Sequence, residues 1–255
     1  MRIHEQFAKL KSGNEAALIG YLTAGFPTME GFLSNLEEAA GSGADIIEIG
    51  IPFSDPIADG PTIQMSSQIG LANGATLPAI LKAIRDLDLN IPLVFMSYLN
   101  PLLAYGQDRL LADMIHAKVT GLIVPDLPVE EAASWKSAAE SRGVDTIFLV
   151  TPASPEERVR RIAEASTGFV YCVSLTGTTG ARHDLSDDLP AFLDRVRSFT
   201  NTPIAVGFGI SGPEHIRRLL PHADGMIVGS RVIDAIRNGE DVGGLIRKLK
   251  DATRK

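Results

Sequence analysis

Three carboxylates lie close together in the segment 46–62, and their placement would suit proton transfer. Glu48 interrupts an apolar run typical of a strand buried on both faces, and Asp55 and Asp59 follow in a loop rich in Pro, Asp and Gly. An ionised carboxylate is costly in such a strand, and acid–base catalysis is the commonest use for one. If the loop returns Asp59 over Glu48, one carboxyl can be protonated while the other is ionised.

Each of these carboxylates also has a purely structural interpretation. Glu48 could belong to an ion pair inside the protein, and Asp55 and Asp59 could be turn residues in Ser-Asp-Pro and Ala-Asp-Gly. Asp126, in Pro-Asp-Leu-Pro, could anchor its loop. The residue types alone leave these alternatives open.

Three glycine-containing segments, 207–211, 228–231 and 176–182, point to a phosphorylated ligand. Backbone N–H groups of such loops, together with a helix N-terminus, bind phosphate without Lys or Arg. The residues 230–235 are typical of a short helix that would complete this site. The length and glycine content of the segment 176–182 suit a lid over the ligand.

The elements that must position these residues alternate regularly along the chain. Short runs rich in Ile, Val and Phe are separated by segments of helical periodicity. We expect strands at 17–24, 45–50, 92–98, 121–124, 146–150, 169–173, 203–207 and 225–228. We expect helices at 29–41, 76–87, 107–117, 129–141, 155–165, 188–199, 212–220 and 241–252.

Eight β/α units predict an α/β fold, a single-domain (β/α)8 TIM barrel over residues 1–255. An open doubly wound sheet is the alternative, but no Gly-x-Gly-x-x-Gly follows the first strand. We expect an N-terminal helix at 1–11 that closes the bottom of the barrel, and short extra helices at 61–73 and 230–235, after strands two and eight. Reactive groups then belong at the C-terminal ends of the strands.

Composition excludes several classes of protein. The net charge of −7 disfavours nucleic acid as a partner. No apolar run reaches the roughly 18–20 residues that span a bilayer, and the first residues lack the apolar region of a signal peptide. The single Cys172 cannot form an internal disulfide. We therefore expect a cytoplasmic protein that binds neither nucleic acid nor membrane.

Several kinds of catalytic site are missing from the pattern. The five histidines are scattered over predicted helices and loops, so no metal site is expected. No lysine ends a predicted strand, which disfavours a Schiff base, and Gly-x-Ser-x-Gly is absent. Carboxylate acid–base catalysis on a phosphorylated substrate remains, without metal, imine or cofactor.

The run 52–64, Pro-Phe-Ser-Asp-Pro-Ile-Ala-Asp-Gly-Pro-Thr-Ile-Gln, resembles the signature of the tryptophan synthase alpha subunits. The segments 22–25, 126–131, 179–182 and 207–210 are similar to further motifs of that family, in the expected order and spacing. The resemblance implies retro-aldol cleavage of indole-3-glycerol phosphate to indole and glyceraldehyde 3-phosphate, in L-tryptophan biosynthesis.

The resemblance also implies roles for individual residues. Glu48 would protonate C3 of the indole ring and take the hydroxyl proton, Asp59 would hydrogen-bond the indole N–H, and Tyr171 would lie near the substrate. The implied indole pocket is Tyr21, Ile63, Tyr98 and Phe208. The residues implied to bind the rest of the substrate, chiefly its phosphate, are Thr179, Gly180, Gly209, Gly229 and Ser230.

A partner is implied as well. Members of the family work with a pyridoxal-phosphate beta subunit in an alpha2beta2 heterotetramer. The alpha chain itself is expected to need no cofactor. Asp55 and Pro56 would lie near that partner. Thr178 and Phe26 depart from the family pattern, which commonly has valine and an acid there. Three rival functions remain: a stand-alone indole-3-glycerol phosphate lyase, a phosphosugar isomerase on the same barrel, and a ligand-gated regulatory module.

Overall fold

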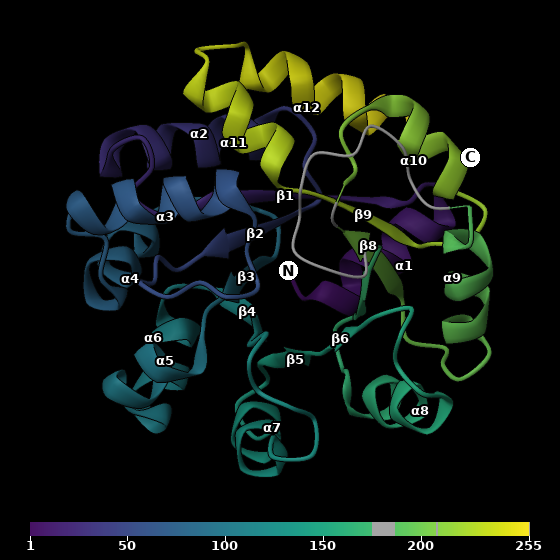
Figure 1. Ribbon diagram of the computed structural model, residues 1–255. Coiled ribbons are helices and arrows are strands. Elements are labelled where there is room, and N and C mark those ends of the chain that lie inside the picture. The colour runs from purple at the N-terminus through teal and green to yellow at the C-terminus, as the bar shows by residue number, and fades with distance from the viewer. Residues whose placement is uncertain (175–186, 208, 255) are drawn as a thin grey trace.

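The computed structural model describes residues 1–174, 187–207 and 209–254, and its parallel strands lie at the centre of a ring of helices (Figure 1). The described strands are β1 Ala17–Thr23, β2 Ile46–Gly50, β3 Leu93–Met96, β4 Val119–Ile123, β5 Asp145–Ile147, β6 Leu149–Val150, β7 Val170–Val173, β8 Ile204–Gly207 and β9 Gly225–Val228. The described helices are α1 Ile3–Ser12, α2 Met29–Gly41, α3 Pro61–Ala72, α4 Leu77–Arg85, α5 Leu99–Tyr105, α6 Gln107–His116, α7 Ala133–Glu140, α8 Glu156–Ala165, α9 Leu189–Arg197, α10 Pro213–Leu219, α11 Ser230–Arg237 and α12 Val242–Asp251.

The strands close into a barrel, which confirms the predicted fold and excludes the open sheet. Their order is β5-β4-β3-β2-β1-β9-β8-β7-β6, and every pair is parallel. The two ends of this order, β5 and β6, are separated in the chain only by Phe148. The ring therefore closes through one interrupted strand.

The prediction of a continuous strand at 146–150 is wrong at Phe148. The N–H of this residue donates to Ser166 Oγ at 3.3 Å, whereas its carbonyl accepts the N–H of Tyr171 at 3.0 Å. Because the N–H of Phe148 has left the ladder, β5 pairs with β4 and β6 pairs with β7.

Alternation along the strands separates two apolar layers. Residues such as Ile19, Ile46 and Val94 face the barrel interior, whereas their neighbours along the strands pack outward against the helices. The helix α1 lies across the centre of the ring in Figure 1 and contributes apolar side chains to the interior cluster. The ring of Phe7 lies 6.1 Å from that of Phe169. The N-terminal helix closes one end of the barrel, as predicted.

The helix after β3, α5, has no counterpart among the predicted elements. Its first residue, Leu99, donates its N–H to the carboxylate of Asp126 at 2.9 Å, so that Asp126 anchors a neighbouring segment. The predicted helix at 129–141 begins only at Ala133, because a turn precedes it in which the N–H of Glu131 bonds the carbonyl of Pro128 at 3.0 Å. In the part of the chain described, no helix is long and apolar enough to cross a membrane.

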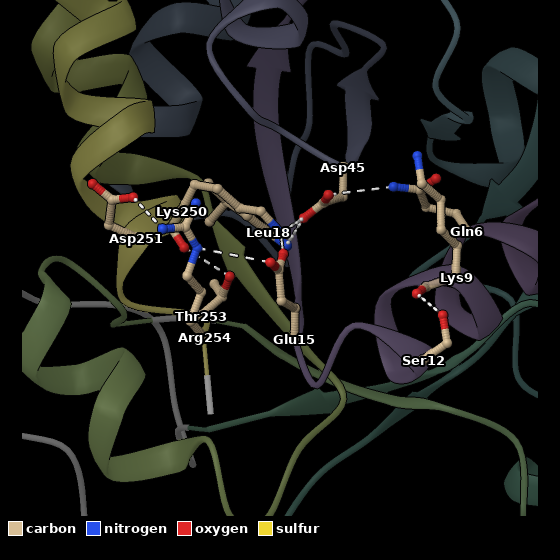
Figure 2. Close-up of polar contacts among 10 residues, drawn as sticks. All are labelled: Gln6, Lys9, Ser12, Glu15, Leu18, Asp45, Lys250, Asp251, Thr253 and Arg254. Atoms are coloured by element: carbon tan, nitrogen blue, oxygen red, sulfur yellow. Dashed lines mark hydrogen bonds and ion pairs between the residues drawn. The ribbon is translucent and has the colours of Figure 1, made fainter.

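A polar network joins α12 to the beginning of β1 and β2 (Figure 2). The ammonium of Lys250 lies 2.7 Å from the carboxylate of Glu15 and 2.9 Å from that of Asp45. Asp45 also accepts the N–H of Leu18 at 2.7 Å and the side-chain amide of Gln6 at 3.3 Å. The buried charge of Asp45 is therefore paired on several sides, and the network holds the C-terminal helix on the barrel.

Candidate active site

Glu48 lies inside the barrel on β2, between Tyr21 of β1 and Val94 of β3 in the strand register. Its side chain is 1% exposed, and neither carboxylate oxygen has a hydrogen-bond partner among the described residues. Burial, and then the charge of Asp59, raise the pKa of Glu48 to about 8. The structure thus rejects the ion-pair interpretation within its described part: Glu48 is a buried acid whose oxygens face the interior.

Asp59 is buried in the loop after β2, close enough to influence Glu48. Tyr98 donates its hydroxyl to Asp59 Oδ2 at 2.9 Å, and the Gln64 side-chain amide donates to the Asp59 carbonyl at 2.8 Å. Burial raises the pKa of Asp59 to about 6, and the hydrogen bond from Tyr98 opposes that rise. The loop brings together two carboxyl groups with different pKa values.

Three contacts that hold this loop were not predicted from the sequence. Besides the bond from Gln64, the Tyr98 hydroxyl accepts the N–H of Ala58 at 3.0 Å, and the Phe53 ring stacks on the Tyr98 ring with centroids 5.3 Å apart. The loop side of each contact, Gln64, Ala58 or Phe53, lies within the run 52–64, so the residue types of this run could have indicated the contacts. Tyr98 thereby connects the end of β3 to both sides of the acidic loop.

Two tyrosines, Tyr21 and Tyr171, share the barrel interior with Glu48, and each lies over a glycine of the strand next to its own. A Cβ atom at Gly50 would stand 2.0 Å from the hydroxyl of Tyr21, and one at Gly207 would stand 2.6 Å from the hydroxyl of Tyr171. Burial raises the pKa of both phenols, and the next contribution comes from Asp59 for Tyr21 and from Glu48 for Tyr171. Gly207 was predicted only as part of the glycine-containing segment 207–211, and the packing role of both glycines was not predicted, because each contacts a side chain on another strand.

An apolar surface surrounds this polar centre. Tyr21, Ile63 and Tyr171 belong to one interior cluster, together with Phe26, which departs from the family pattern. Phe26 is only 3% exposed. Buried aromatic and aliphatic side chains thus surround Glu48 inside the barrel.

The predicted phosphate-binding residues are only partly described. Gly229 follows the C-terminal end of β9 and lies beside Tyr21. Ser230, the next residue, is exposed and begins α11. Gly209 has a left-handed backbone (φ +79°), which favours glycine, and follows β8. The helix beginning at Ser230 was predicted. Thr178, Thr179, Gly180 and Phe208 lie outside the described residues.

Asp55 and Pro56 lie on the outer, more exposed side of the acidic loop, whereas Asp59 of the same loop is buried. Asp55 is exposed, and its carboxylate accepts the Ser54 hydroxyl at 2.5 Å. A cleft of about 360 Å³ adjoins this loop, with Pro52, Phe53, Leu71, Leu77, Pro101 and Tyr105 among its lining residues. Across the described residues, no group of three His, Cys, Asp or Glu side chains is placed to hold a metal ion.

Comparisons with known proteins agree on one family. A family model for the tryptophan synthase alpha chain matches residues 7–254. The chain is 47% identical over 238 residues to the tryptophan synthase alpha chain of Roseiflexus castenholzii, covering 92% of this chain and 91% of that one. It is 46% identical over 265 residues to the alpha chain of Geobacter sp. strain M21, covering 100% and 98%.

Solved structures give the same result. A structure of Mycobacterium tuberculosis tryptophan synthase matches with a TM-score of 0.92 at 36% identity, covering 100% of this chain and 98% of that one. Tryptophan synthase subunit alpha from Legionella pneumophila matches with a TM-score of 0.89 at 32% identity, covering 99% and 98%. In this family the pyridoxal phosphate resides in the beta subunit. The matches span the barrel and every described part of its interior site, and the chain therefore belongs to the tryptophan synthase alpha chain family, the lyases of tryptophan biosynthesis.

Proposed function

We propose that Glu48 and Asp59 carry out the cleavage of indole-3-glycerol phosphate to indole and glyceraldehyde 3-phosphate. The observation that carries this proposal is a pair of buried carboxyl groups, with pKa values of about 8 and about 6, at the end of β2. At neutral pH the first is mostly protonated and the second mostly ionised. Such a pair divides the work of acid and electrostatic stabiliser between two similar side chains.

The chemistry follows from these protonation states. Glu48 gives its proton to C3 of the indole ring, which turns the ring into a leaving group, and Asp59 accepts a hydrogen bond from the indole N–H and stabilises its positive charge. The Glu48 carboxylate then takes the proton of the side-chain hydroxyl as the carbon–carbon bond breaks. Indole and the aldehyde are released, and Glu48 is protonated again. Tyr171 contacts the substrate beside Glu48.

The remaining contacts follow the shape of the substrate. Tyr21, Ile63, Tyr98 and Phe208 enclose the indole ring. Gly209, Gly229 and Ser230, with Thr179 and Gly180, bind the glycerol phosphate, the phosphate chiefly through backbone N–H groups and the serine hydroxyl. Support comes from the apolar interior cluster on one side and the start of α11 on the other.

Indole release from indole-3-glycerol phosphate tests this proposal. We expect Glu48→Gln and Asp59→Asn each to lower kcat about 10²- to 10⁴-fold, the usual contribution of a general acid or base. Asp145→Asn is a matched control, because Asp145 is also a buried carboxyl with an oxygen that lacks a described partner, but it begins β5. Full activity of Glu48→Gln with an intact fold would refute the assignment.

We further infer that the outer side of the acidic loop binds a tryptophan synthase beta subunit in an alpha2beta2 complex in the cytoplasm. Ile57 is 75% exposed and follows the cleft-lining residues 51–54, and Leu103 is 58% exposed on α5, which supplies Pro101, Ala104 and Tyr105 to the lining. Large exposed apolar side chains around a cleft are typical of protein interfaces.

Binding to a purified beta subunit tests this surface. Ile57→Asp should weaken binding, whereas Ile115→Asp should not, because Ile115 is 47% exposed on α6 away from the cleft lining. A turnover that is unchanged by any amount of beta subunit would favour the stand-alone lyase instead.

A further inference from the structure

Three buried hydroxyl groups form a chain beside the carboxylate pair, and the reaction above gives no role to two of them. Ser66 of α3 and Thr23 of β1 are 0% and 1% exposed, and their Oγ atoms lie 2.6 Å apart. The Thr23 hydroxyl donates in turn to the hydroxyl of Tyr21 at 3.4 Å. The chain of hydroxyls therefore runs from α3 through the end of β1 to Tyr21, which we propose as part of the indole pocket.

The proton of Tyr21 is free for the site in the arrangement in which each hydroxyl of the chain donates toward Tyr21. The Ser66 proton has two acceptors within reach, Thr23 Oγ1 and the Ile63 carbonyl at 2.9 Å. When Ser66 donates to Thr23 and Thr23 donates to Tyr21, no acceptor for the Tyr21 proton lies within hydrogen-bond distance in the described part of the chain. A buried phenol with an unused proton will donate it to an acceptor that approaches.

The nearest acidic groups are those of the proposed reaction. Tyr21 and Glu48 are direct cross-strand partners, and both are buried inside the barrel. Gly50, two residues beyond Glu48, leaves the space over which the Tyr21 ring lies. Burial, and then the charges of Asp59 and Glu48, raise the pKa of the phenol, so Tyr21 keeps its proton beside them.

The same hydroxyl chain also fixes the helix that follows Asp59. Ser66 lies in the second turn of α3, which begins two residues after Asp59. Further along the helix, a Cβ atom at Gly70 would stand 2.5 Å from the carbonyl of Ala24. At its end, Asn73 donates to the carbonyls of Gly25 at 2.9 Å and Pro27 at 2.7 Å. The helix α3 is thus held along its length against the segment that leaves β1.

We propose that Ser66 and Thr23 are positioning residues, which aim the Tyr21 hydroxyl at the Glu48–Asp59 pair as a hydrogen-bond donor and keep α3 in register with β1. This inference rests on the proposed function of that pair. It adds Tyr21 as a polar member of a pocket wall that the family resemblance describes only as a surface for the indole ring.

Steady-state kinetics of the full chain with indole-3-glycerol phosphate over a range of pH test the inference. Tyr21→Phe should lower kcat about three- to tenfold, the net contribution of one hydrogen bond. Because kcat reports on the substrate complex, in which we propose that Tyr21 donates to the carboxyl pair, loss of this donor should also move the acid limb of the kcat profile to higher pH. Thr23→Val should shift the limb in the same direction by less, and Thr23→Ser should restore the wild-type profile.

Ser66→Ala acts through Thr23, so the double variant Thr23→Val/Ser66→Ala should match Thr23→Val alone. Two controls should leave the profile unchanged. Thr146→Val removes a buried hydroxyl that has no partner among the described residues, and Tyr105→Phe removes a phenol bonded at 2.6 Å to Asp113 outside the barrel. These controls separate the hydroxyl chain from the general loss of a hydroxyl or phenol.

A Thr23→Val variant that loses thermal stability but keeps the wild-type kcat and pH profile would overturn the inference, as would additive effects of Thr23→Val and Ser66→Ala. If Thr23→Val does not fold, Tyr21→Phe and Ser66→Ala decide the question in the same way. Failure of the proposed function gives a different result, since the wild-type chain would then release no indole, or Glu48→Gln would release it normally.

Discussion

Two acids three residues apart, Asp45 just before β2 and Glu48 in the middle of it, are both buried but have very different surroundings. Asp45 precedes the strand, is 7% exposed, and is satisfied by an ammonium, a backbone N–H and a side-chain amide (Figure 2). Glu48, three residues later and 1% exposed, has no partner for either oxygen among the described residues. Burial alone therefore does not separate these two acids, whereas the number of partners that their oxygens have does.

This contrast has a physical reason. A buried charge that is fully paired contributes to the folded state, whereas an unpaired one destabilises it and is retained only where another property requires it. The pKa of both acids is raised by burial, but for Asp45 the bonds from Leu18 and Lys250 oppose the rise. We therefore expect Asp45 to contribute to stability and Glu48 to the proposed reaction.

The largest expected effect is that the amide variants of these two acids change activity and stability in opposite ways. Glu48→Gln should abolish most activity yet stabilise the fold, whereas Asp45→Asn should keep the activity and cost about 1–3 kcal/mol of stability. The folded pKa of Glu48, about 8, lies above its unfolded value of 4.5, so wild-type stability falls as pH rises between these values. The advantage of Glu48→Gln should therefore grow by about 1.4 kcal/mol per pH unit over this window.

Urea unfolding at several pH values, with indole release as the second readout, measures this crossover. The matched pair is informative because each change replaces one buried carboxyl group, just before or within β2, by its amide. Loss of activity in Asp45→Asn without loss of stability would contradict the expected division between Asp45, which stabilises the fold, and Glu48, which acts in the proposed reaction.

A smaller effect is expected from Lys250, the cation that pairs with Asp45. Lys250→Met leaves Asp45 and Glu15 without their shared ammonium, and should lower the free energy of unfolding by about 3 kcal/mol, the lower end for a broken buried ion pair. Thermal unfolding should show this loss, while kcat at a temperature where the variant is folded should be unchanged. Lys248→Met is a control, because Lys248 is an exposed residue of the same helix.

The smallest expected effect comes from Tyr98, which donates a hydrogen bond to Asp59. Tyr98→Phe removes the bond that lowers the pKa of Asp59, so this pKa should rise above its value of about 6. The acid limb of the kcat profile should move to higher pH, with a loss of about three- to tenfold at neutral pH that lessens as the pH is raised. An unmoved acid limb would show that Asp59 does not control that limb.

The sequence predicts the barrel well, because regular alternation of apolar runs and turn residues is a local property. It also indicates Glu48 and Asp59, since a carboxylate in an apolar strand and an acidic loop are visible without any fold. Helix α5 escaped prediction because its first N–H is bonded by Asp126, from the neighbouring loop. The broken strand at Phe148 depends in the same way on Ser166.

The hydroxyl chain and the two glycines beneath the tyrosines show the same limit. Thr23 and Ser66 are ordinary residues of a strand and a helix until the fold places their hydroxyls 2.6 Å apart. The directions of the pKa shifts also need the structure, because burial and neighbouring charges are properties of the assembled site.

The placement of Tyr21 over Gly50 and Tyr171 over Gly207 has a consequence for how this pocket can change shape. In each pair, one strand supplies the ring and the next strand supplies the space it fills, since any Cβ atom at the glycine would overlap the phenol. The volume at such a position belongs to the pair rather than to either residue. A larger residue at position 50 would therefore be tolerated only together with a smaller one at position 21. Reshaping the wall for a different ring thus requires exchanging both members of a pair at once.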